Sequence, residues 1–313
     1  MPGITIAMLN DMELAAKLGK KGTTSDIQMY NYRVREKDLT VAYPLKYPEK
    51  LQSLLYVLDL CDVPLFVVKD FSSVLGEEIV ATSRFGFTNG FVVFEETLQK
   101  DTWEKIVKNT TLSKFEVVEK SIPHLLEHFA TLEPVKKSDF EHVCIDHFFN
   151  VKGVGTVILG VARGTVKKHD KLRLFPLDKI VEVKSIQVHD VDVEQAENGE
   201  RVGLALKGVE ATELDRGFVL APPDALRVGQ KIKIIGEMER YYKGMPENIT
   251  HIYVRLSLVP AKLRVLERNG EKLTAEIELQ KQVALKPGDN LILVDLNAKG
   301  LRIAGSGRVE QIF

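Results

Sequence analysis

The chain has 313 residues, enough for two or three domains that each have a core. Its 43 Lys and Arg residues balance 44 Asp and Glu residues, and the formal net charge of −1 excludes a global positive field for nucleic acid. RNA binding would therefore need a local basic patch. Cys61 and Cys144 lie in apolar runs without metal-site spacing, as expected of free thiols in a reducing compartment. Neither a signal peptide nor a membrane span is indicated, so we expect a cytoplasmic protein with no membrane partner.

Short apolar strands and helical segments alternate over residues 1–134. Strands are expected at 4–9, 63–68, 90–94 and 115–118, and helices at 51–60, 76–85 and 122–128. This alternation is typical of an α/β domain with a mainly parallel sheet covered by helices, in which ligands bind where strands end and helices begin. His124 and His128 have the spacing of paired metal ligands, but no third ligand is indicated, so no metal site is predicted.

The stretch after the first strand is unsuited to a nucleotide. A phosphate-binding loop has a glycine, four residues and then Gly-Lys-Ser/Thr, because its amides must wrap the phosphates. The sequence has Asn10-Asp11-Met12-Glu13-Leu14-Ala15-Ala16-Lys17, with no glycine and with two acids. Shape and charge both disfavour phosphate here, so no cofactor is expected, neither GTP nor magnesium.

The next segment, 18–26, is basic and contains two glycines. One interpretation is a relocated anion loop of Lys20, Lys21 and Thr23, which would bind RNA phosphate or a nucleotide. The other, which we favour, is a flexible solvated loop.

Two further domains are predicted from short alternating strands. A polar linker at 132–139 opens the second domain, 135–223, whose strands are expected at 156–159, 171–175, 181–184 and 201–206. Pro222-Pro223 marks the start of the third domain, 224–313, whose expected strands are 231–235, 252–258, 261–266, 274–279, 290–295 and 301–312. Glycine-punctuated alternation of this kind is typical of small closed barrels. The turn at Asn269-Gly270 is expected to supply two positive φ angles.

Three motifs of the second domain carry a resemblance. They are Phe149–Val157 (FNVKGVGTV), Gly199–Gly208 (GERVGLALKG) and Asp215–Leu220 (DRGFVL). Together they resemble the second domain of translational GTPases of the elongation factor Tu type, with variants most similar to the archaeal selenocysteine-specific elongation factor. Residues 300–309 resemble the closing strands of that family's third domain. The resemblance implies a degenerate P-loop GTPase-like α/β domain followed by two elongation-factor-type β-barrels.

The resemblance also implies two later nucleotide signatures, and both are degraded. Asp-x-Pro-Gly-His matches Ala42–Lys46, where only Pro44 remains, and Asn-Lys-x-Asp should follow the strand at 90–93, where the sequence reads Phe94–Thr97. Together with the stretch at 10–17, this predicts a pseudo-GTPase domain and a protein that is not an enzyme.

A ligand pocket on the second domain is implied by the resemblance. In the family this pocket receives the aminoacyl end of tRNA, and its positions fall here on Asp146, Phe149 and Arg201. Arg201 could pair with a carboxylate or selenol-like anion and Asp146 with an ammonium group. Alternatively, Asp146 and Arg201 form a salt bridge across neighbouring strands with no ligand. His147 is expected at the surface, and of Phe148 and Phe149 only one can face the core.

The third domain is implied to contact the T stem of tRNA. Possible RNA contacts are Arg240, Tyr241, Tyr242, Lys243, Arg302 and Arg308. The alternative is that these are ordinary exposed residues. The sequence ends at Phe313, without the extra C-terminal domain of the selenocysteine factor, which argues against selenocysteine decoding itself.

Three functional hypotheses follow. The first is a non-hydrolysing, elongation-factor-like protein whose barrels bind tRNA, aminoacyl-tRNA or the ribosomal factor site, with another translation protein as a further possible partner. The second is a residual GTPase that uses Lys20, Lys21 and Thr23. The third is a protein–protein adaptor that offers the barrels as a rigid platform.

Overall fold

The computed structural model describes residues 3–35, 37–95, 99–135 and 139–313. It divides into two compact units, Met1–Val135 and Lys136–Phe313, which are described separately. The expectations for Glu96 and Thr97, and those for the linker residues Lys136 to Ser138, lie outside the described residues.

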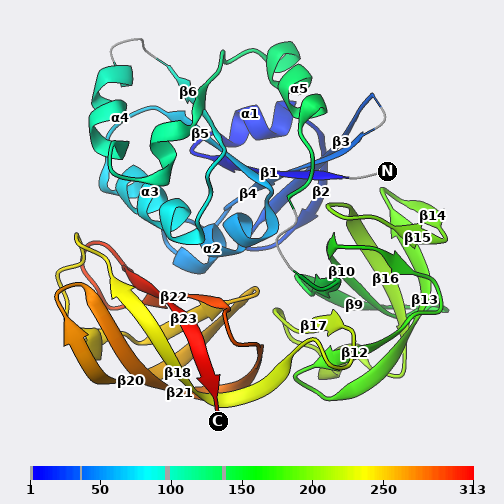
Figure 1. The fold of residues 1–313 in the computed structure, drawn as a ribbon. Helices are drawn as coiled ribbons and strands as arrows, with labels where there is room; N and C mark the ends of the chain where they lie inside the picture. The colour runs from blue at the N-terminus through cyan, green and yellow to red at the C-terminus, as the bar shows by residue number, and fades with distance from the viewer. Residues whose placement is uncertain (1–2, 36, 96–98, 136–138) are drawn as a thin grey trace. The chain divides into compact units, whose positions relative to one another are not determined.

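The first unit is built on a sheet that has seven strands in its described part (Figure 1). The strands are β1 (Ile4–Leu9), β2 (Lys20–Thr24), β3 (Gln28–Val34), β4 (Lys37–Tyr43), β5 (Val63–Val68), β6 (Phe91–Phe94) and β7 (Glu116–Val117). Their order is β2-β3-β4-β1-β5-β6-β7. In this order, each neighbouring pair in β4-β1-β5-β6-β7 is parallel, whereas the pairs β2-β3 and β3-β4 are antiparallel. The predicted, mainly parallel α/β architecture is confirmed.

Helices cover both faces of this sheet. They are α1 (Met12–Lys17), α2 (Leu51–Leu60), α3 (Ser73–Phe85), α4 (Gln99–Val107) and α5 (Ile122–Thr131). Leu14 of α1 and Phe129 of α5 pack with Leu65 of β5 on one face. On the other face Trp103 of α4 packs against Phe66 of β5, with ring centroids 5.4 Å apart. Successive strand residues point to opposite faces, so β5 is buried on both sides.

The expectation of a flexible loop at residues 18–26 is wrong, because Lys20–Thr24 forms the edge strand β2. It pairs antiparallel with β3, and Lys20 lies opposite Asn31. Gly19 permits the close approach, since a Cβ there would lie 2.9 Å from the Asn31 carbonyl oxygen. By pairing with β3, the backbone N–H and C=O groups of β2 gain hydrogen-bond partners within the protein, which a solvated loop would lack.

The second unit begins with a closed barrel. Its strands are β8 (His142–Cys144), β9 (His147–Val151), β10 (Gly155–Arg163), β11 (Val166–Lys167), β12 (Lys171–Phe175), β13 (Lys179–Val188), β14 (Val191–Val193), β15 (Gln195–Ala196), β16 (Arg201–Lys207) and β17 (Val219–Ala221). The ring runs β12-β17-β8-β10-β16-β13 and closes through the pairing of β12 with β13. Strand β9 forms a hairpin with β10 outside this ring.

A second closed barrel follows, in the order β18-β21-β20-β19-β22-β23. Its strands are β18 (Arg227–Met238), β19 (His251–Val254), β20 (Ser257–Asn269), β21 (Lys272–Leu285), β22 (Asn290–Val294) and β23 (Ile303–Ile312). The two predicted barrels are thus confirmed. Within this unit they share an apolar cluster, in which Phe175 and Val219 of the first barrel pack with Leu226 and Ala284 of the second.

Two details of the second barrel differ from expectation. The strand predicted at 252–258 is a tight β19–β20 hairpin whose turn residues, Arg255 and Leu256, have φ angles of 43° and 59°. In the β20–β21 hairpin Asn269 pairs with Lys272, so the loop residues are Gly270 and Glu271, and of the two only Gly270 has a positive φ. A two-residue loop with glycine first needs only one such angle.

Candidate functional site

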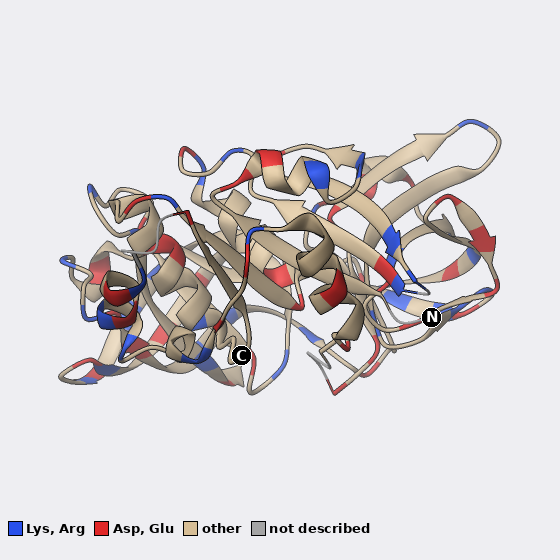
Figure 2. Ribbon diagram, turned by 90° about the horizontal axis from the view of Figure 1, so that it is seen from above, with Lys and Arg blue, Asp and Glu red and all other residues tan. Residues whose placement is uncertain are grey.

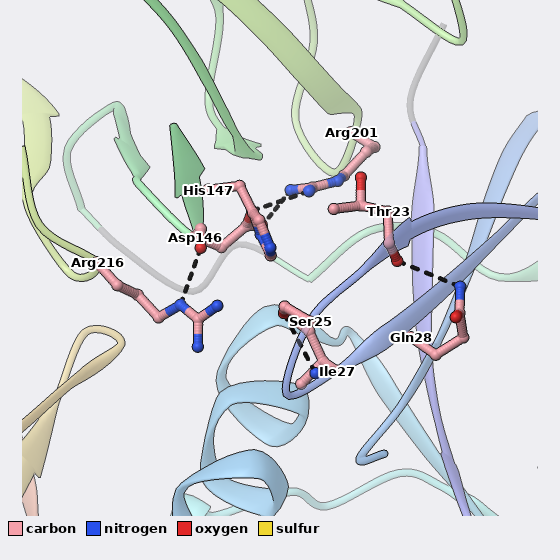
Figure 3. Close-up of polar contacts among 8 residues, drawn as sticks. All are labelled: Thr23, Ser25, Ile27, Gln28, Asp146, His147, Arg201 and Arg216. Carbon is pink, nitrogen blue, oxygen red and sulfur yellow. Dashed lines mark hydrogen bonds and ion pairs between the residues drawn. The ribbon is translucent and has the colours of Figure 1, made fainter. Parts of the chain in front are cut away.

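The first barrel positions Asp146 and Arg201 on either side of β10. Asp146 precedes β9, and its amide donates to the carbonyl of Leu159 in β10 at 3.0 Å. Arg201 begins β16 and lies opposite Val161 of β10. The Arg201 guanidinium reaches both carboxylate oxygens of Asp146, with Nη2 at 2.9 Å from Oδ1 (Figure 3). The pair therefore spans β10 rather than joining directly neighbouring strands.

This ion pair is buried and has further partners. The side chains of Asp146 and Arg201 are 1% and 7% exposed. His147 Nδ1 lies 3.1 Å from Asp146 Oδ1, and Arg216 Nε donates to the Asp146 carbonyl at 2.8 Å (Figure 3). Burial alone would raise the pKa of Asp146, but the Arg201 charge and the His147 hydrogen bond outweigh it and hold the pKa below its usual value. Asp146 is thus an anion with a complete set of partners.

Two members of this cluster were missed from the sequence. His147 is half-buried rather than fully at the surface as expected, because its side chain is 20% exposed and contacts Asp146. Arg216 stands in the DRGFVL motif, but the motif alone gives no sign that its guanidinium reaches Asp146. Of the two interpretations offered for Asp146 and Arg201, the structure contains the ion pair, and ligand binding stays a prediction.

Phe148 and Phe149 point to opposite faces of β9, as the alternation predicts. Phe148 packs against the barrel core, whereas Phe149 is 44% exposed. Phe149 shares its face with His147, two residues earlier. An exposed aromatic side chain on this face can stack on a planar ligand group.

The predicted RNA contacts of the second barrel separate into different environments. Arg240, Tyr241 and Lys243 are exposed in the segment after β18. Tyr242 is 8% exposed, and its hydroxyl donates to Asp295 Oδ2 at 2.8 Å. Burial and the Asp295 carboxylate raise the pKa of Tyr242. The expectation that Tyr242 contacts RNA is wrong, because it belongs to the core.

Backbone pairing places Arg302 near this segment and Arg308 farther away. The Glu239 amide donates to the Ala304 carbonyl at 2.8 Å, which holds the start of the segment beside the half-buried Arg302. Arg308 is exposed on β23 and lies opposite Ile235 of β18. Gly305 of β23 pairs with Met238, the last residue of β18 before the segment. Arg308 lies three residues beyond Gly305, roughly 10 Å along the strand.

The proposed anion loop at Lys20, Lys21 and Thr23 has the wrong geometry for one anion. Lys20 and Lys21 are consecutive, exposed residues of β2, so their side chains leave opposite faces of the strand. The Thr23 carbonyl accepts a hydrogen bond from Gln28 Nε2 at 3.2 Å (Figure 3). The two lysines therefore do not converge.

The turn after β1 is a helix cap. Asn10 has a φ of 69°, and the Asp11 side chain caps α1 by accepting from the Leu14 amide at 3.0 Å.

Elsewhere in this unit the Nε2 atoms of His124 and His128 lie 3.0 Å apart. Among the described residues, no three His, Cys, Asp or Glu side chains gather as a metal site requires. No helix within the described ranges is both long and apolar enough to cross a bilayer.

Comparison with known proteins gives three kinds of match. Residues 155–221 match the model of elongation factor Tu domain 2. The chain is 36% identical over 312 residues to the uncharacterized protein MJ0325 of Methanocaldococcus jannaschii, covering 99% of this chain and 100% of that protein. It is 31% identical over 281 residues to the selenocysteine-specific elongation factor of the same organism, covering 82% of this chain and 58% of that factor. The chain thus spans little more than half of that longer relative.

Solved structures share the fold along the chain. Translation elongation factor SelB from Methanococcus maripaludis, in complex with the GTP analogue GPPNHP, matches with a TM-score of 0.83 and 21% identity, over 100% of this chain and 80% of that one. A bacterial selenocysteine-specific elongation factor, EF-Sec, matches with a TM-score of 0.81 and 20% identity, over 99% of this chain and 58% of that one.

Proposed function

The chain belongs to the translational GTPase-like proteins of the elongation factor Tu type, close to the selenocysteine-specific elongation factors, and from this premise we propose that it acts in translation by binding RNA without hydrolysing GTP. Its barrels bind tRNA, aminoacyl-tRNA or the ribosomal factor site in the cytoplasm. The first barrel provides the ligand site, for which we assign the exposed Phe149 and the buried Asp146–Arg201 pair.

One observation carries the proposal. The barrel that matches elongation factor Tu domain 2 keeps a buried and fully partnered ion pair, while the turn after β1 is closed by the acidic cap Asp11. A loop that wraps phosphates needs glycine and converging amides, and this turn offers a carboxylate instead. Both features support ligand binding by the barrel rather than nucleotide chemistry in the α/β unit.

The charge distribution supports a contact made by a few local groups. Figure 2 shows basic and acidic residues interleaved along the ribbon rather than sorted by sign. Arg240, Lys243 and Arg308 are exposed on the second barrel. Each phosphate that such a group neutralises adds to the salt dependence of binding.

An electrophoretic shift with aminoacylated and deacylated tRNA, at two salt concentrations, tests RNA binding. We expect a shift that weakens as salt rises, and co-sedimentation with ribosomes if the factor site is the target. Absence of both would contradict the proposal and favour a protein–protein adaptor. Isothermal titration with GTP and magnesium tests the other half, since micromolar binding would favour the residual GTPase.

A further inference from the structure

Four charged side chains meet where the parallel strands of the α/β unit end. Asp11 follows β1, Lys69 follows β5, Glu95 follows β6, and Lys120 lies between β7 and α5. Lys120 Nζ is 2.8 Å from Asp11 Oδ2 and 2.7 Å from Glu95 Oε1, and Lys69 Nζ is 3.7 Å from Asp11 Oδ2. Ligands of open α/β sheets bind at this edge. In this protein, four of the chain's own charged side chains occupy the edge of the sheet where a ligand would bind.

Asp11 is the centre of this network. Its side chain is 5% exposed, whereas those of Lys120 and Lys69 are 35% and 43% exposed. One carboxylate oxygen accepts from the Leu14 amide, and the other faces both lysines. Burial alone would raise the pKa of Asp11, but Lys120, the Leu14 amide and Lys69 together lower it. An amide and two ammonium groups around one buried anion are the partners that a bound phosphate oxygen would receive.

Besides the partly exposed Glu95, which also pairs with Lys120, a second buried acid lies at this edge, and it does not compete for the lysines. Glu78 of α3 accepts from Asn10 Nδ2 at 2.6 Å, and it is 1% exposed. Burial raises the pKa of Glu78 to about 8, so this side chain is mostly uncharged at neutral pH. Asp11 is therefore the buried negative charge that Lys69 and Lys120 face.

We propose that the Asp11 carboxylate is a built-in anion that occupies, between Lys120 and Lys69, the place of a bound phosphate group and joins the strand ends without any ligand. This inference rests on the proposed absence of nucleotide chemistry. It implies that the two lysines form a latent phosphate site, which opens when the Asp11 carboxylate is removed.

The first test isolates the charge of Asp11 in the full-length protein. Asp11→Asn keeps a capping oxygen for the Leu14 amide but removes the negative charge. Trp103 is the only tryptophan of the chain and is buried in the α/β unit, so its fluorescence reports the melting of that unit. We expect the melting temperature to fall by about 3 to 8 °C. Glu13→Ala, which removes an exposed acid from the same helix, is the control and should change it by less than about 2 °C.

The second test refills the site. Asp11→Ser also keeps a capping oxygen, but it leaves the volume of the carboxylate open. Pyrophosphate, compared with chloride at equal ionic strength, should raise the Trp103-detected melting temperature of Asp11→Ser by at least about 2 °C more than that of the wild type or Glu13→Ala. Adding Lys120→Met to Asp11→Ser should abolish the rescue.

Three results would overturn the inference: an Asp11→Asn protein that melts like the wild type, a pyrophosphate effect equal in all variants, or a rescue that survives Lys120→Met. Binding of tRNA by the wild type is measured separately, so failure here leaves the RNA-binding proposal standing. Conversely, loss of the RNA result leaves the rescue experiment valid.

Discussion

Arg255 and Asp289 form a bidentate ion pair in the second barrel. This pair stabilises the β19–β20 turn, whose residues Arg255 and Leu256 adopt positive φ angles that their side chains disfavour. The guanidinium of Arg255 contacts both carboxylate oxygens of Asp289, and its Nη1 also donates to the Ala284 carbonyl at 3.2 Å. The two side chains are 14% and 7% exposed. Arg255 itself has a φ of 43°, which is uncommon outside glycine, Asn and Asp.

Asp289→Ala should therefore destabilise the barrel unit strongly. The change leaves a nearly buried guanidinium without its carboxylate and removes the acceptor of the Lys286 amide, so we expect a loss of about 3 kcal/mol. Urea unfolding followed by circular dichroism measures it. Glu310→Ala is the matched control, because Glu310 pairs with Lys233 at 2.7 Å at the surface and should cost at most about 1 kcal/mol. Equal losses would contradict this account.

Glu78 should make the α/β unit less stable as the pH rises. Its folded-state pKa is raised to about 8 from 4.5, so its favourable contribution is complete below pH 4.5 and is lost as the pH rises towards 8. Glu78→Gln cannot ionise and keeps an acceptor for Asn10. The variant should gain stability relative to the wild type between pH 5 and pH 8, by about 1 to 3 kcal/mol. Trp103-detected urea unfolding at both pH values measures this gain, and a pH-independent difference would contradict it.

Adjacent residues of the segment after β18 should separate RNA binding from stability. Arg240→Ala and Lys243→Ala remove exposed charges, so each should weaken tRNA binding and reduce the salt slope by about 1 without changing stability. Tyr242→Phe removes the hydroxyl bonded to Asp295 and should cost about 1 to 2 kcal/mol with little effect on affinity. Gel shifts at several salt concentrations and urea unfolding, performed on the same preparations, distinguish the two effects.

The two phenylalanines of β9 provide a second matched pair. Phe149→Ala removes an exposed ring, so stability should change by less than about 1 kcal/mol, while the preference for aminoacylated over deacylated tRNA should fall. Phe148→Ala removes a ring packed on the barrel core and should cost about 3 kcal/mol. Competition gel shifts with the two tRNA forms provide the measurement. An unchanged preference in Phe149→Ala would separate this ring from the ligand pocket.

The parts of the fold with strong local patterns could be predicted from the sequence. β1 and β5 are mainly apolar runs buried on both faces, with Thr5 the one polar residue of the two strands, and their bounds match the prediction. The barrels were recognisable from alternation and glycine spacing. The edge strand β2 was not, because its lysines and glycines have the composition of a loop and its pairing with β3 is a tertiary effect.

The candidate site shows the same division. Asp146, Phe149 and Arg201 could be named because motifs fix their positions. The contact of Arg216 with Asp146 spans 70 positions and depends on barrel closure, whereas His147 directly follows Asp146 and only its orientation was hidden from the sequence. Tyr242 was misassigned because a run of Arg, Tyr, Tyr and Lys looks exposed throughout. Its burial depends on Asp295, 53 positions away, which no local pattern reveals.

The apolar cluster shared by the two barrels has a mechanical consequence. Phe175 and Val219 lie against Leu226 and Ala284, and Lys281 reaches Asp215 of the other barrel at 2.8 Å, so neither barrel can rotate without breaking these contacts. A partner that contacts both barrels therefore meets two surfaces whose separation is fixed. Selectivity among RNAs would then come from length and curvature as much as from the groups at either end.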